Sequence, residues 1–392
     1  MVQVAVALTL TSFALYAAMM GFFTWAAYRR RRGLPVAAET GPRVTIFKPL
    51  AGCDDDLEDN LESFARLEYP SFEVLLGIAR RNDPALEVAC RFLARHPALD
   101  ARVVFTDPHA AVNPKVAQLI GLEREATGEV YVISDSNVRV RPTYLWSMVN
   151  ELADGKAGIV TSLFSGTGEQ SLGAALENLQ ICASTAPGIA SMDVATGRAF
   201  TVGKSLAVRR RDLQRLGGFA PVGGVLAEDH LLGRRFQEAG FETRLSMEVV
   251  ENRNVRCSIA RTFERHTRWA KMRRSLFPIA FCVEPVLTPI GVASVALLLS
   301  PTRVMLALFA CVTLAQMAWA SLAVRLLRGR FVWWYAPLEI VRSYVALGCW
   351  GCACLSRRIS WRGHLFWLLR GTAIVPVDPP SDQPPSRERL PA

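Results

Sequence analysis

An apolar run that ends in a polar turn is the first place where this sequence could do chemistry. Val130–Ser134 consists mostly of β-prone residues and leads directly into Asp135, Ser136 and Asn137. Such a run predicts a buried strand of a parallel sheet, and ligands of open α/β sheets bind at the carboxyl ends of these strands. Carboxylate and amide oxygens suit hard divalent cations that also hold phosphate oxygens, so Asp135 and Asn137 are candidate metal ligands. The alternative is that they only cap the next helix.

Two groups further along the chain carry the charges that a group-transfer reaction needs. Glu228 and Asp229 stand together at the predicted start of a helix, where they either complement the helix dipole or supply a general base. Arg265 and Arg268 are three residues apart on one predicted helical face, and Trp269 follows them. The arginine fork matches phosphate oxygens, and tryptophan offers a flat surface to a ring or a lipid headgroup. The alternative is a solvated basic helix that lies on anionic lipid.

These groups need a scaffold, and from Arg43 onward the sequence alternates strand and helix patterns. Strands and helices at this spacing predict βαβ units with a mostly parallel sheet, which is an α/β fold. The predicted strands are Val44–Phe47 (ended by Lys48 and Pro49), Phe72–Ile78, Arg102–Phe105, Val130–Ser134, Ile159–Leu163 and, as the last one, Thr243–Val249. The predicted helices are one near Asp54–Asp56, Pro84–Arg95 with Asp83 as its cap, one from Asn113, Gly173–Ala183 and Glu228–Ala239.

The beginning of the chain predicts a transmembrane anchor. Residues from Val2 to Tyr28 include no charged side chain, and 27 residues are enough to cross a bilayer. Arg29–Arg32 follows this stretch, whereas a signal peptide carries its basic residues before the apolar core. By the positive-inside rule, the amino terminus points outward and the chain from Arg29 to Arg274 lies in the cytoplasm.

A second membrane region is predicted in the last third of the chain. Val304–Val324 is a span without charge, and Ser275–Pro289 is apolar but interrupted by prolines, which predicts a broken or interfacial segment. Phe331–Leu355 is apolar yet carries Glu339 and Arg342, so it either crosses the membrane or re-enters as a hairpin. The predicted domains are the anchor 1–28, a basic linker 29–42, a catalytic domain 43–274, membrane-embedded and interfacial helices 275–370 and a disordered proline-rich tail 371–392. Within the fourth of these, Trp361–Arg370 is predicted to be an interfacial amphipathic helix.

The composition agrees with this division. Hydrophobic residues make up 51% of the chain and charged residues 20%, as expected for a membrane protein that also has a sizeable polar domain. The formal net charge is +10, and the basic residues gather in clusters that mostly border apolar segments. This arrangement favours a membrane surface and a phosphorylated substrate, and no nucleic-acid partner is expected. The nine cysteines show no paired spacing for zinc, so reduced thiols are expected.

In this order the motifs resemble the ceramide glucosyltransferase family, which consists of membrane-bound glycosyltransferases with a GT-A catalytic domain. The resemblance covers roughly residues 44–289. It rests on Phe47-Lys-Pro-Leu, Asn60-Leu-Glu-Ser-Phe, Leu67-Glu-Tyr-Pro, Glu73-Val-Leu-Leu, Asp83-Pro, Asn113-Pro-Lys, Asp135-Ser-x-Val-Arg-Val, Glu228-Asp, Arg265-x-x-Arg-Trp and Cys282-Val-Glu-Pro. The aspartate and Arg-Trp skeleton alone is shared with cellulose- and hyaluronan-type synthases.

The resemblance implies a GT-A fold, Rossmann-like with a mostly parallel sheet, and a role for each matching residue. Asp83 would lie at the nucleotide, and Asp135 with Asn137 would hold Mg²⁺ or Mn²⁺ on the diphosphate. Asp229 would be the catalytic base. The implied substrate-binding residues are Lys48, Asp83, Lys115, Glu228, Arg265, Arg268 and Trp269.

The function that follows is an inverting, metal-dependent transfer of a hexose from a UDP-sugar to a lipid hydroxyl. Glucose is the expected sugar and ceramide the expected acceptor, in an integral membrane protein of a bacterial inner membrane or its equivalent, with the catalytic domain in the cytoplasm. The alternatives are a hopanoid N-acetylglucosaminyltransferase or another glycolipid synthase, and then a processive polysaccharide synthase, for which the second membrane region is short. A non-catalytic lipid-binding scaffold would need a degenerate acidic cluster, whereas Asp83, Asp135, Glu228 and Asp229 are all present.

Overall fold

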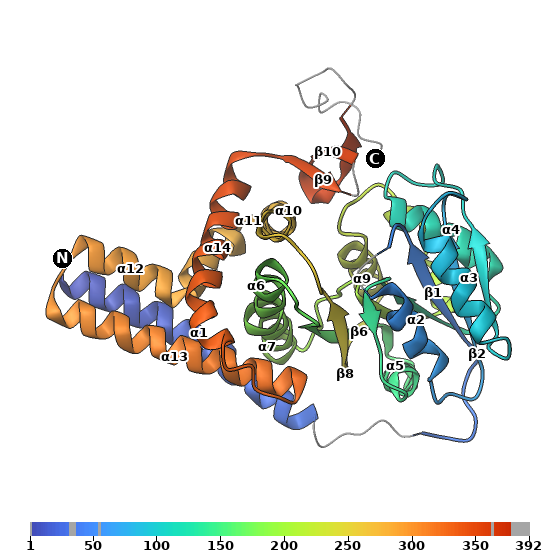
Figure 1. Ribbon diagram of the computed structural model, residues 1–392, viewed down its shortest axis with the longest axis horizontal. Coiled ribbons are helices and arrows are strands. Elements are labelled where there is room, and N and C mark those ends of the chain that lie inside the picture. Colours follow the sequence, from blue (N-terminus) through green and yellow to red (C-terminus); the bar gives the residue numbers. More distant parts are fainter. Residues whose placement is uncertain (1, 31–36, 54–55, 362–363, 378–392) are drawn as a thin grey trace.

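The computed structural model of the chain describes residues 2–30, 37–53, 56–361 and 364–377. An α/β body holds the large sheet, and a bundle of apolar helices projects from one side of it (Figure 1). A small sheet formed by the segment after the last long helix lies above the junction between the two. The expected fold class is therefore confirmed: a mostly parallel α/β domain is joined to an amino-terminal apolar helix and to a carboxyl-terminal helical region.

Among the described residues, the large sheet has eight strands in the order β3-β2-β1-β4-β7-β6-β8-β5. The first four pair in parallel, whereas β7 runs antiparallel between β4 and β6. The strands are β1 (Val44–Leu50), β2 (Phe72–Ile78), β3 (Ala101–Phe105), β4 (Val130–Ser134), β5 (Val138–Arg139), β6 (Ala157–Thr167), β7 (Ser205–Arg209) and β8 (Glu242–Arg253). Every residue of β1, β4 and β6 is buried, as is usual for strands covered on both faces.

Alternate side chains of these strands build two separate cores, one on each face of the sheet. Ile46 and Val132 lie in the first core, and Phe47 and Ile133 lie in the second. The first core is covered by α2 (Leu57–Ala65), α3 (Ala85–Arg95) and α5 (Tyr144–Leu152), and the second by α4 (Pro114–Glu125) and α9 (Glu228–Glu238). The other helices of the body are α6 (Leu172–Gln180), a π-helical turn (Ile181–Thr185), α7 (Ala186–Thr196), α8 (Arg210–Arg215) and α10 (Ile259–Leu276).

Strand β1 is longer than the sequence predicts, because it continues through Lys48 and Pro49 to Leu50. Its pairing with β4 ends at Phe47, while its pairing with β2 continues to Leu50. Proline lacks a backbone donor but is tolerated where a strand has lost a neighbour on one side. The extension carries β1 past the end of β4, towards the edge of the sheet where ligands bind in α/β folds.

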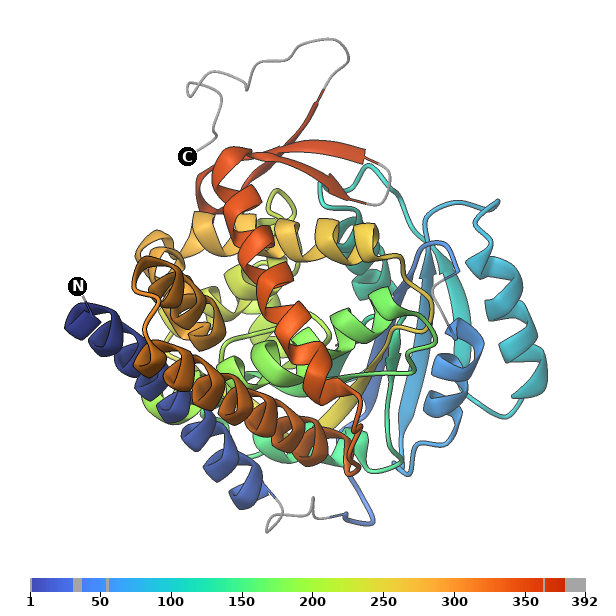
Figure 2. The same ribbon diagram turned by 60° about the vertical axis from the view of Figure 1, so that its left-hand side comes forward.

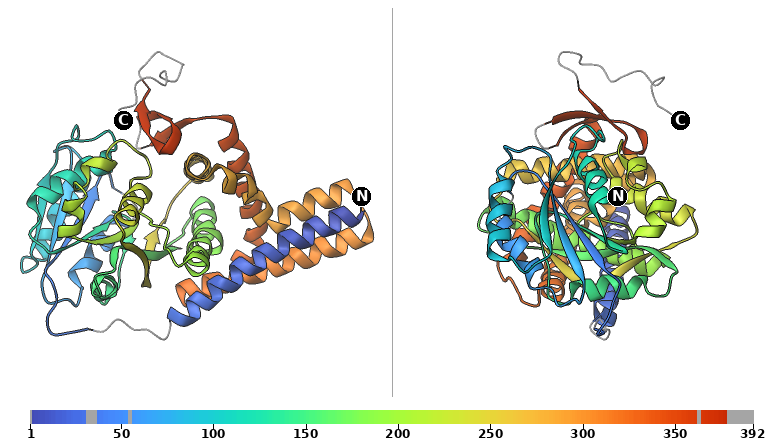
Figure 3. Two further views of the ribbon diagram at one scale, coloured as in Figure 1. Left: turned by 180° about the vertical axis from the view of Figure 1, so that it is seen from behind. Right: turned by 90° about the vertical axis from the view of Figure 1, so that its right-hand side faces the viewer.

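The apolar helices are α1 (Val2–Arg30), α11 (Pro278–Val283), α12 (Pro289–Leu299), α13 (Arg303–Arg328) and α14 (Tyr335–Leu355). Within the described residues, α1, α13 and α14 are long and apolar enough to cross a membrane. Residues 278–299 form two helical pieces that meet at a bend of 70°, and they make a fourth candidate span if the two pieces are counted as one span. The predicted break before residue 290 is thereby confirmed. Seen from behind, α1 lies against both α12 and α13 (Figure 3).

The first core is shared between the α/β body and this helical bundle. Met20 of α1 and Val324 of α13 belong to the same buried cluster as Ile46 of the sheet. Ser191 of α7 also donates a hydrogen bond of 2.6 Å to the carbonyl of Met19 in α1. The bundle is therefore packed onto the body through continuous apolar contacts, and α1 is more than a tether.

Of the two alternatives for residues 331–355, the structure excludes the re-entrant hairpin, because α14 is one continuous helix. It turns away from the direction of the bundle and lies across α10 and α6 (Figure 2). Glu339 and Arg342 pair with each other at 2.6 Å, and they also hydrogen-bond to Gln316 of α13 and Gln180 of α6, respectively. Charges inside apolar helices are stable when they face protein partners of this kind.

The prediction of an amphipathic helix at Trp361–Arg370 is wrong. This part of the chain forms a three-stranded antiparallel sheet of β9 (Arg358–Trp361), β10 (His364–Leu368) and β11 (Ile374–Pro376) among the described residues, so β8 is not the last strand. Phe366 and Leu368 are buried at the two-residue period of a strand. The predicted disordered tail 371–392 is ordered up to residue 377, and residues 378–392 lie outside the described residues.

Several other boundaries differ from the prediction, and β6 and β8 extend beyond the predicted strands Ile159–Leu163 and Thr243–Val249. The first helix includes Arg29 and Arg30, which were assigned to the linker; residues 31–36 of that linker lie outside the described residues. The helix predicted at Gly173–Ala183 ends at Gln180, where a π-helical turn begins and leads into α7. The acidic run Asp54–Asp56 is described only at Asp56, which precedes α2.

The pairing of Glu339 with Arg342 leads to a test of stability. Glu339 is fully buried, so Glu339→Ala would leave the Arg342 guanidinium buried without its carboxylate. We expect a loss of about 3–5 kcal/mol in the free energy of unfolding, seen as a lower melting temperature in detergent. Glu238→Ala is the matched control, because it breaks a similar Arg–Glu pair that lies exposed on α9 and should change the melting temperature little. Equal effects of both substitutions would contradict the structural role of Glu339.

Candidate active site

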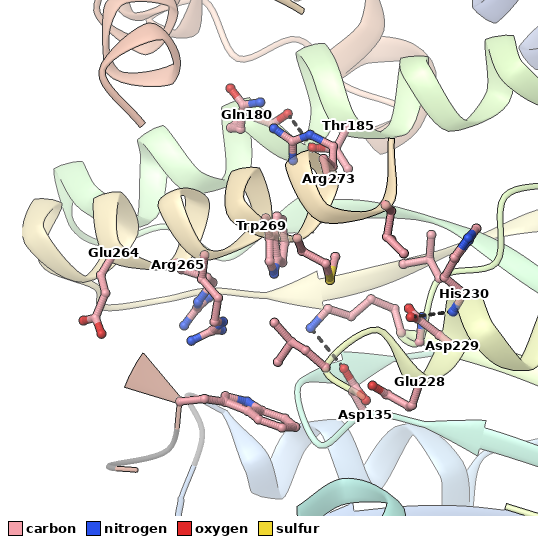
Figure 4. A pocket seen from close by; sticks show the side chains of 18 of the residues that line it. Asp135, Gln180, Thr185, Glu228, Asp229, His230, Glu264, Arg265, Trp269 and Arg273 are labelled. Atoms are coloured by element: carbon pink, nitrogen blue, oxygen red, sulfur yellow. Dashed lines mark hydrogen bonds and ion pairs between the residues drawn. The ribbon is translucent and has the colours of Figure 1, made fainter. Parts of the chain in front are cut away.

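A cavity of about 2500 Å³ lies between the carboxyl edge of the sheet, α10 and the small carboxyl-terminal sheet. It collects most of the residues that the sequence singles out, and Figure 4 shows several of them facing one another. The predicted site residues that line it are Asp83, Lys115, Asp135, Asn137, Glu228, Asp229, Arg265, Arg268 and Trp269.

Lys48 is the predicted substrate-binding residue that does not line this cavity. It is fully buried at the end of β1, where its ammonium group donates to the carbonyl of Asp135 at 2.6 Å. Lys48 therefore holds the turn after β4 in place and so positions Asp135. Lys48 itself does not line the cavity.

A partly buried ion-pair cluster forms the floor of the cavity. The ammonium group of Lys115 lies 2.8 Å from one oxygen of Asp135 and 3.1 Å from Glu228. Lys204 contacts the second oxygen of Asp135 at 3.2 Å and the side-chain oxygen of Asn137 at 3.1 Å. Two lysines from different segments thus neutralise the carboxylate at the end of β4.

The sequence did not single out Lys204 as a site residue. Lys204 directly precedes β7, and the antiparallel register that pairs Ser134 with Ser205 brings it beside Asp135. The Gly203-Lys204-Ser205 tripeptide is the only local signal, and it does not reveal this register. Pairing between strands 70 residues apart in sequence is set by the tertiary fold.

The N-cap of α4 holds the backbone of Lys115 in place. Asn113 is the N-cap of α4, and its side-chain oxygen accepts hydrogen bonds from the backbone amides of Lys115 and Val116. Its side-chain amide donates to the carbonyl of Val225 at 2.8 Å and reaches Glu228 at 3.3 Å. One asparagine therefore starts α4 and also ties that helix to the segment in front of α9.

Asp229 holds a neighbouring loop as well as its own helix. One carboxylate oxygen accepts from the backbone amide of Gly203 at 2.5 Å, and the other accepts from the amide of His230 at 2.7 Å. The side chain of Thr201 donates to the Asp229 carbonyl at 2.9 Å. The carboxylate keeps further lone pairs, since an ionised carboxylate can accept about four hydrogen bonds.

The pKa values of the carboxyl groups in this cluster are shifted in opposite directions. Burial alone would raise the pKa of Asp135, but the charges of Lys115 and Lys204 lower the pKa well below its ordinary value. Burial raises the pKa of Asp229, because only Lys115 and two backbone hydrogen bonds oppose it. Burial also raises the pKa of Glu228 against the charge of Lys115. Asp135 is therefore the more acidic group, because its pKa is lowered, whereas the pKa values of Glu228 and Asp229 are raised.

Asp83 lies at the other side of the cavity, after β2. Its carboxylate accepts from the backbone amides of Gly52 and Ala85, both at 2.9 Å, so it holds the chain after β1 and the first residue of α3. The N-cap of α3 is Pro84, one residue after the predicted cap Asp83. These bonds keep Asp83 at the carboxyl edge of the sheet, among the lining residues of the cavity.

The two arginines of α10 contact different parts of the protein. Arg265 forms an ion pair with Glu177 of α6 and donates to the side chain of Asn254 at 3.2 Å. Arg268 donates to the carbonyl of Ser360 in β9 at 2.9 Å. Both also line the cavity with Trp269, so α10 forms its roof (Figure 4).

The small carboxyl-terminal sheet completes the site, and the sequence did not predict it. The amide of Leu226 donates to the carbonyl of Thr372 at 2.8 Å, and the amide of Ile374 donates to the carbonyl of Gly224 at 3.0 Å. These bonds hold the loop that leads directly into Glu228. Alternation of apolar residues in His364–Leu368 was the available signal, but the segment is short and was interpreted at helical spacing.

The oxygen donors at the end of β4 suit a hard divalent cation. Among the described residues, no group of three or more His, Cys, Asp or Glu side chains could hold a metal. Asp135 and Asn137 nevertheless offer a carboxylate and an amide oxygen on the cavity wall, and Lys115 and Lys204 now contact these oxygens where a cation would bind. Mg²⁺ is often bound by one or two carboxylates together with substrate phosphates and water, and this donor set fits that arrangement.

Comparisons with known proteins agree on one family. The model of glycosyl transferase family 21 matches residues 9–374. Ceramide glucosyltransferase 3 of Caenorhabditis elegans is 25% identical over 345 residues, which cover 86% of this chain and 74% of that protein. Ceramide glucosyltransferase 1 of the same organism is 29% identical, over 63% of this chain and 53% of that protein. The resemblance found in the sequence motifs is thereby confirmed.

Solved structures with a similar fold were also found. A mannosyltransferase from Pyrobaculum calidifontis in complex with GDP-Man and Mn²⁺ is 21% identical, with a TM-score of 0.47, over 87% of this chain and 99% of that one. Glucosyl-3-phosphoglycerate synthase from Mycobacterium tuberculosis in complex with Mn²⁺, UDP and phosphoglyceric acid is 18% identical, with a TM-score of 0.35, over 55% of this chain and 72% of that one.

The ion-pair cluster predicts how stability depends on pH when Lys115 is removed. In Lys115→Met, Glu228 and Asp229 lose their neutralising cation, so their folded-state pKa values rise further above the unfolded values. A raised folded-state pKa contributes stability below the unfolded pKa, and this stability is lost as pH rises through the folded pKa. The melting-temperature deficit of the variant should therefore be larger at about pH 8 than at about pH 5.

Lys156→Met is the control for this measurement, because Lys156 is an exposed lysine outside the cavity. Its melting temperature should stay close to that of the wild type at both pH values. A Lys115→Met deficit that does not change with pH would mean that the carboxylates do not depend on Lys115 for their charge.

Proposed function

This chain belongs to glycosyltransferase family 21, and from that premise we propose that it transfers a hexose from a UDP-sugar to the hydroxyl group of a membrane lipid. The related ceramide glucosyltransferases support glucose as the sugar and ceramide as the acceptor. The observation that carries the proposal is the cavity itself, which joins a cluster of cations and carboxylates to helices apolar enough to cross a membrane. A sugar-transferring enzyme with a lipid acceptor needs both surfaces at one site.

The donor diphosphate fits the cationic side of the cluster. Lys115 and Lys204 present ammonium groups on the cavity wall, and α10 adds the guanidinium groups of Arg265 and Arg268. Fixed cations at the leaving group stabilise the charge that develops there in the transition state. Asp135 and Asn137 would hold Mg²⁺ or Mn²⁺, and such a cation supplies Lewis-acid stabilisation of phosphate oxygens when bound.

Asp229 is the proposed general base. It would take the proton from the acceptor hydroxyl while that oxygen forms a bond to the anomeric carbon and the bond from this carbon to the diphosphate breaks. UDP leaves with the electron pair of the broken bond. One displacement by one base inverts the anomeric centre, and burial raises the pKa of Asp229 towards the range in which a carboxylate is an effective base.

The Asp229→Asn substitution distinguishes two roles of Asp229, that of a catalytic base and that of an acceptor of backbone hydrogen bonds. Asparagine keeps the shape but has no proton affinity, so turnover should fall by roughly 10²–10⁴-fold, while UDP-sugar affinity changes little. Asparagine can accept only one of the two backbone hydrogen bonds that Asp229 now accepts, so the melting temperature is measured beside turnover and donor affinity. An Asp229→Asn enzyme that is folded and turns over near the wild-type rate would exclude Asp229 as the base.

We also propose that the α/β body faces the cytoplasm, as the arginines at the end of α1 and α13 favour. Cys90 is exposed on α3, far along the chain from the membrane helices. A membrane-impermeant maleimide should label Cys90 only after lysis, whereas a Gln3→Cys variant should be labelled on intact cells, as read by peptide mapping. Labelling of Cys90 in intact cells would reverse this orientation.

A further inference from the structure

The cavity is larger than its donor requires. Small-molecule sites usually enclose about 300–1000 Å³, whereas this cavity encloses about 2500 Å³. Part of the excess lies between α1 and α7. We call this part the α1–α7 arm and define it by Leu15, Met19 and Phe22 of α1 and Gly188 and Met192 of α7, all of which line the cavity.

The α1–α7 arm is apolar and opens onto the outside of the protein. Leu15 and Phe22 are each 45% exposed, and Met192 is 50% exposed. All three line the same cavity as Asp229, and two of them belong to a helix that is long and apolar enough to cross a membrane. The arm therefore has an apolar mouth beside that helix and is continuous with the proposed base.

Gly188 keeps the arm open. A methyl group added at Gly188 would meet no heavy atom within 4 Å, so close packing does not explain the glycine. Gly173 of α6 is the opposite case, because an added methyl group there would lie 2.3 Å from the carbonyl oxygen of Cys257. Glycine is less stable than alanine inside a helix. Gly21 of α1 also has open space beside it, but the space beside Gly188 belongs to the cavity, whereas Gly21 does not line the cavity.

Polar side chains lie where the arm meets the rest of the cavity. Ser184 and Thr185 belong to the π-helical turn, and with Gln180 they line the cavity wall (Figure 4 labels Gln180 and Thr185). Single π-helical turns inside α-helices occur often at functional sites. An apolar channel that ends in a few polar groups matches a ligand with a hydrocarbon chain and a polar head.

We propose that the α1–α7 arm binds a hydrocarbon chain of the acceptor lipid, with the polar head at the π-helical turn and the hydroxyl group turned towards Asp229. The proposal deepens the proposed function and rests on it for the identity of the acceptor. A hydrocarbon chain is the favoured occupant because the arm is apolar, opens beside a membrane helix and ends in the same cavity as the reacting carboxylate.

Gly188→Leu tests the arm by filling it from a position where the new side chain meets open space. The probe is a ceramide with a photoactivatable diazirine in its acyl chain, added to the full-length protein in phosphatidylcholine vesicles. Peptide mapping should find the cross-link on α1 or α7 of the wild type. Gly188→Leu should reduce this cross-link at least about tenfold, and Gly188→Ala should reduce it less, because discrimination in apolar pockets scales with added methylene groups.

Gly21→Leu is the matched control. Gly21 lies on the exposed side of α1, outside the cavity, and an added side chain there also meets open space. It should cross-link as the wild type does. UDP affinity should be unchanged and the melting temperature should not fall in any of the three variants, which would show that the donor site and the fold are intact. If Gly188→Leu does not fold, Gly188→Ala decides.

The outcomes separate this proposal from the proposed function. Cross-linking on α1 or α7 that Gly188→Leu removes supports the arm, even if no sugar is transferred to ceramide, in which case the assigned acceptor is wrong. Sugar transfer to ceramide with no cross-link on α1 or α7, or with a cross-link that Gly188→Leu leaves unchanged, overturns the arm and leaves the function standing.

Discussion

The neutralisation of partly buried carboxylates at one edge of the sheet is the constraint on which the site depends. An isolated buried carboxylate is so unfavourable that it must be paired or protonated. Asp135 is paired with two lysines that come from opposite sides, Lys115 from the start of α4 and Lys204 from the start of β7. The capping of α4 by Asn113 and the antiparallel course of β7 therefore contribute to the site as directly as the acidic residues do.

The same reasoning explains why only part of this structure could be predicted from the sequence. Strands β2 and β4 were placed at their observed ends because their apolar runs are continuous and stop at polar or turn residues. Asp135, Glu228 and Asp229 were found because their residue types and local positions carry a signal. Lys204 was missed because its role depends on a strand register, and the small carboxyl-terminal sheet was missed because its three short strands have little local pattern. The cavity roles assigned to these residues stay predictions.

The helices that suggest a membrane protein are also part of the catalytic body. Met20 of α1 packs in the same core as Ile46 of β1, and Arg342 of α14 hydrogen-bonds to Gln180 in the wall of the cavity. Glu339 and Arg342 made the crossing of residues 331–355 doubtful from sequence, because a charge in an apolar segment is unfavourable unless it has a partner. Glu339 and Arg342 are partners of each other within α14. Their further partners, Gln316 and Gln180, lie in α13 and α6, and sequence periodicity does not show these contacts.

The bonds from Thr372 and Ile374 to the loop before Glu228 also bear on the order in which the protein is made. A ribosome adds these residues after α1, α12, α13 and α14, so the loop in front of the proposed base receives its last backbone partners only once the membrane helices have been synthesised. A nascent chain that has folded its α/β body therefore still lacks a complete site. The complete site can then form only after the candidate membrane helices have been synthesised, which separates the appearance of activity from the folding of the body that carries it.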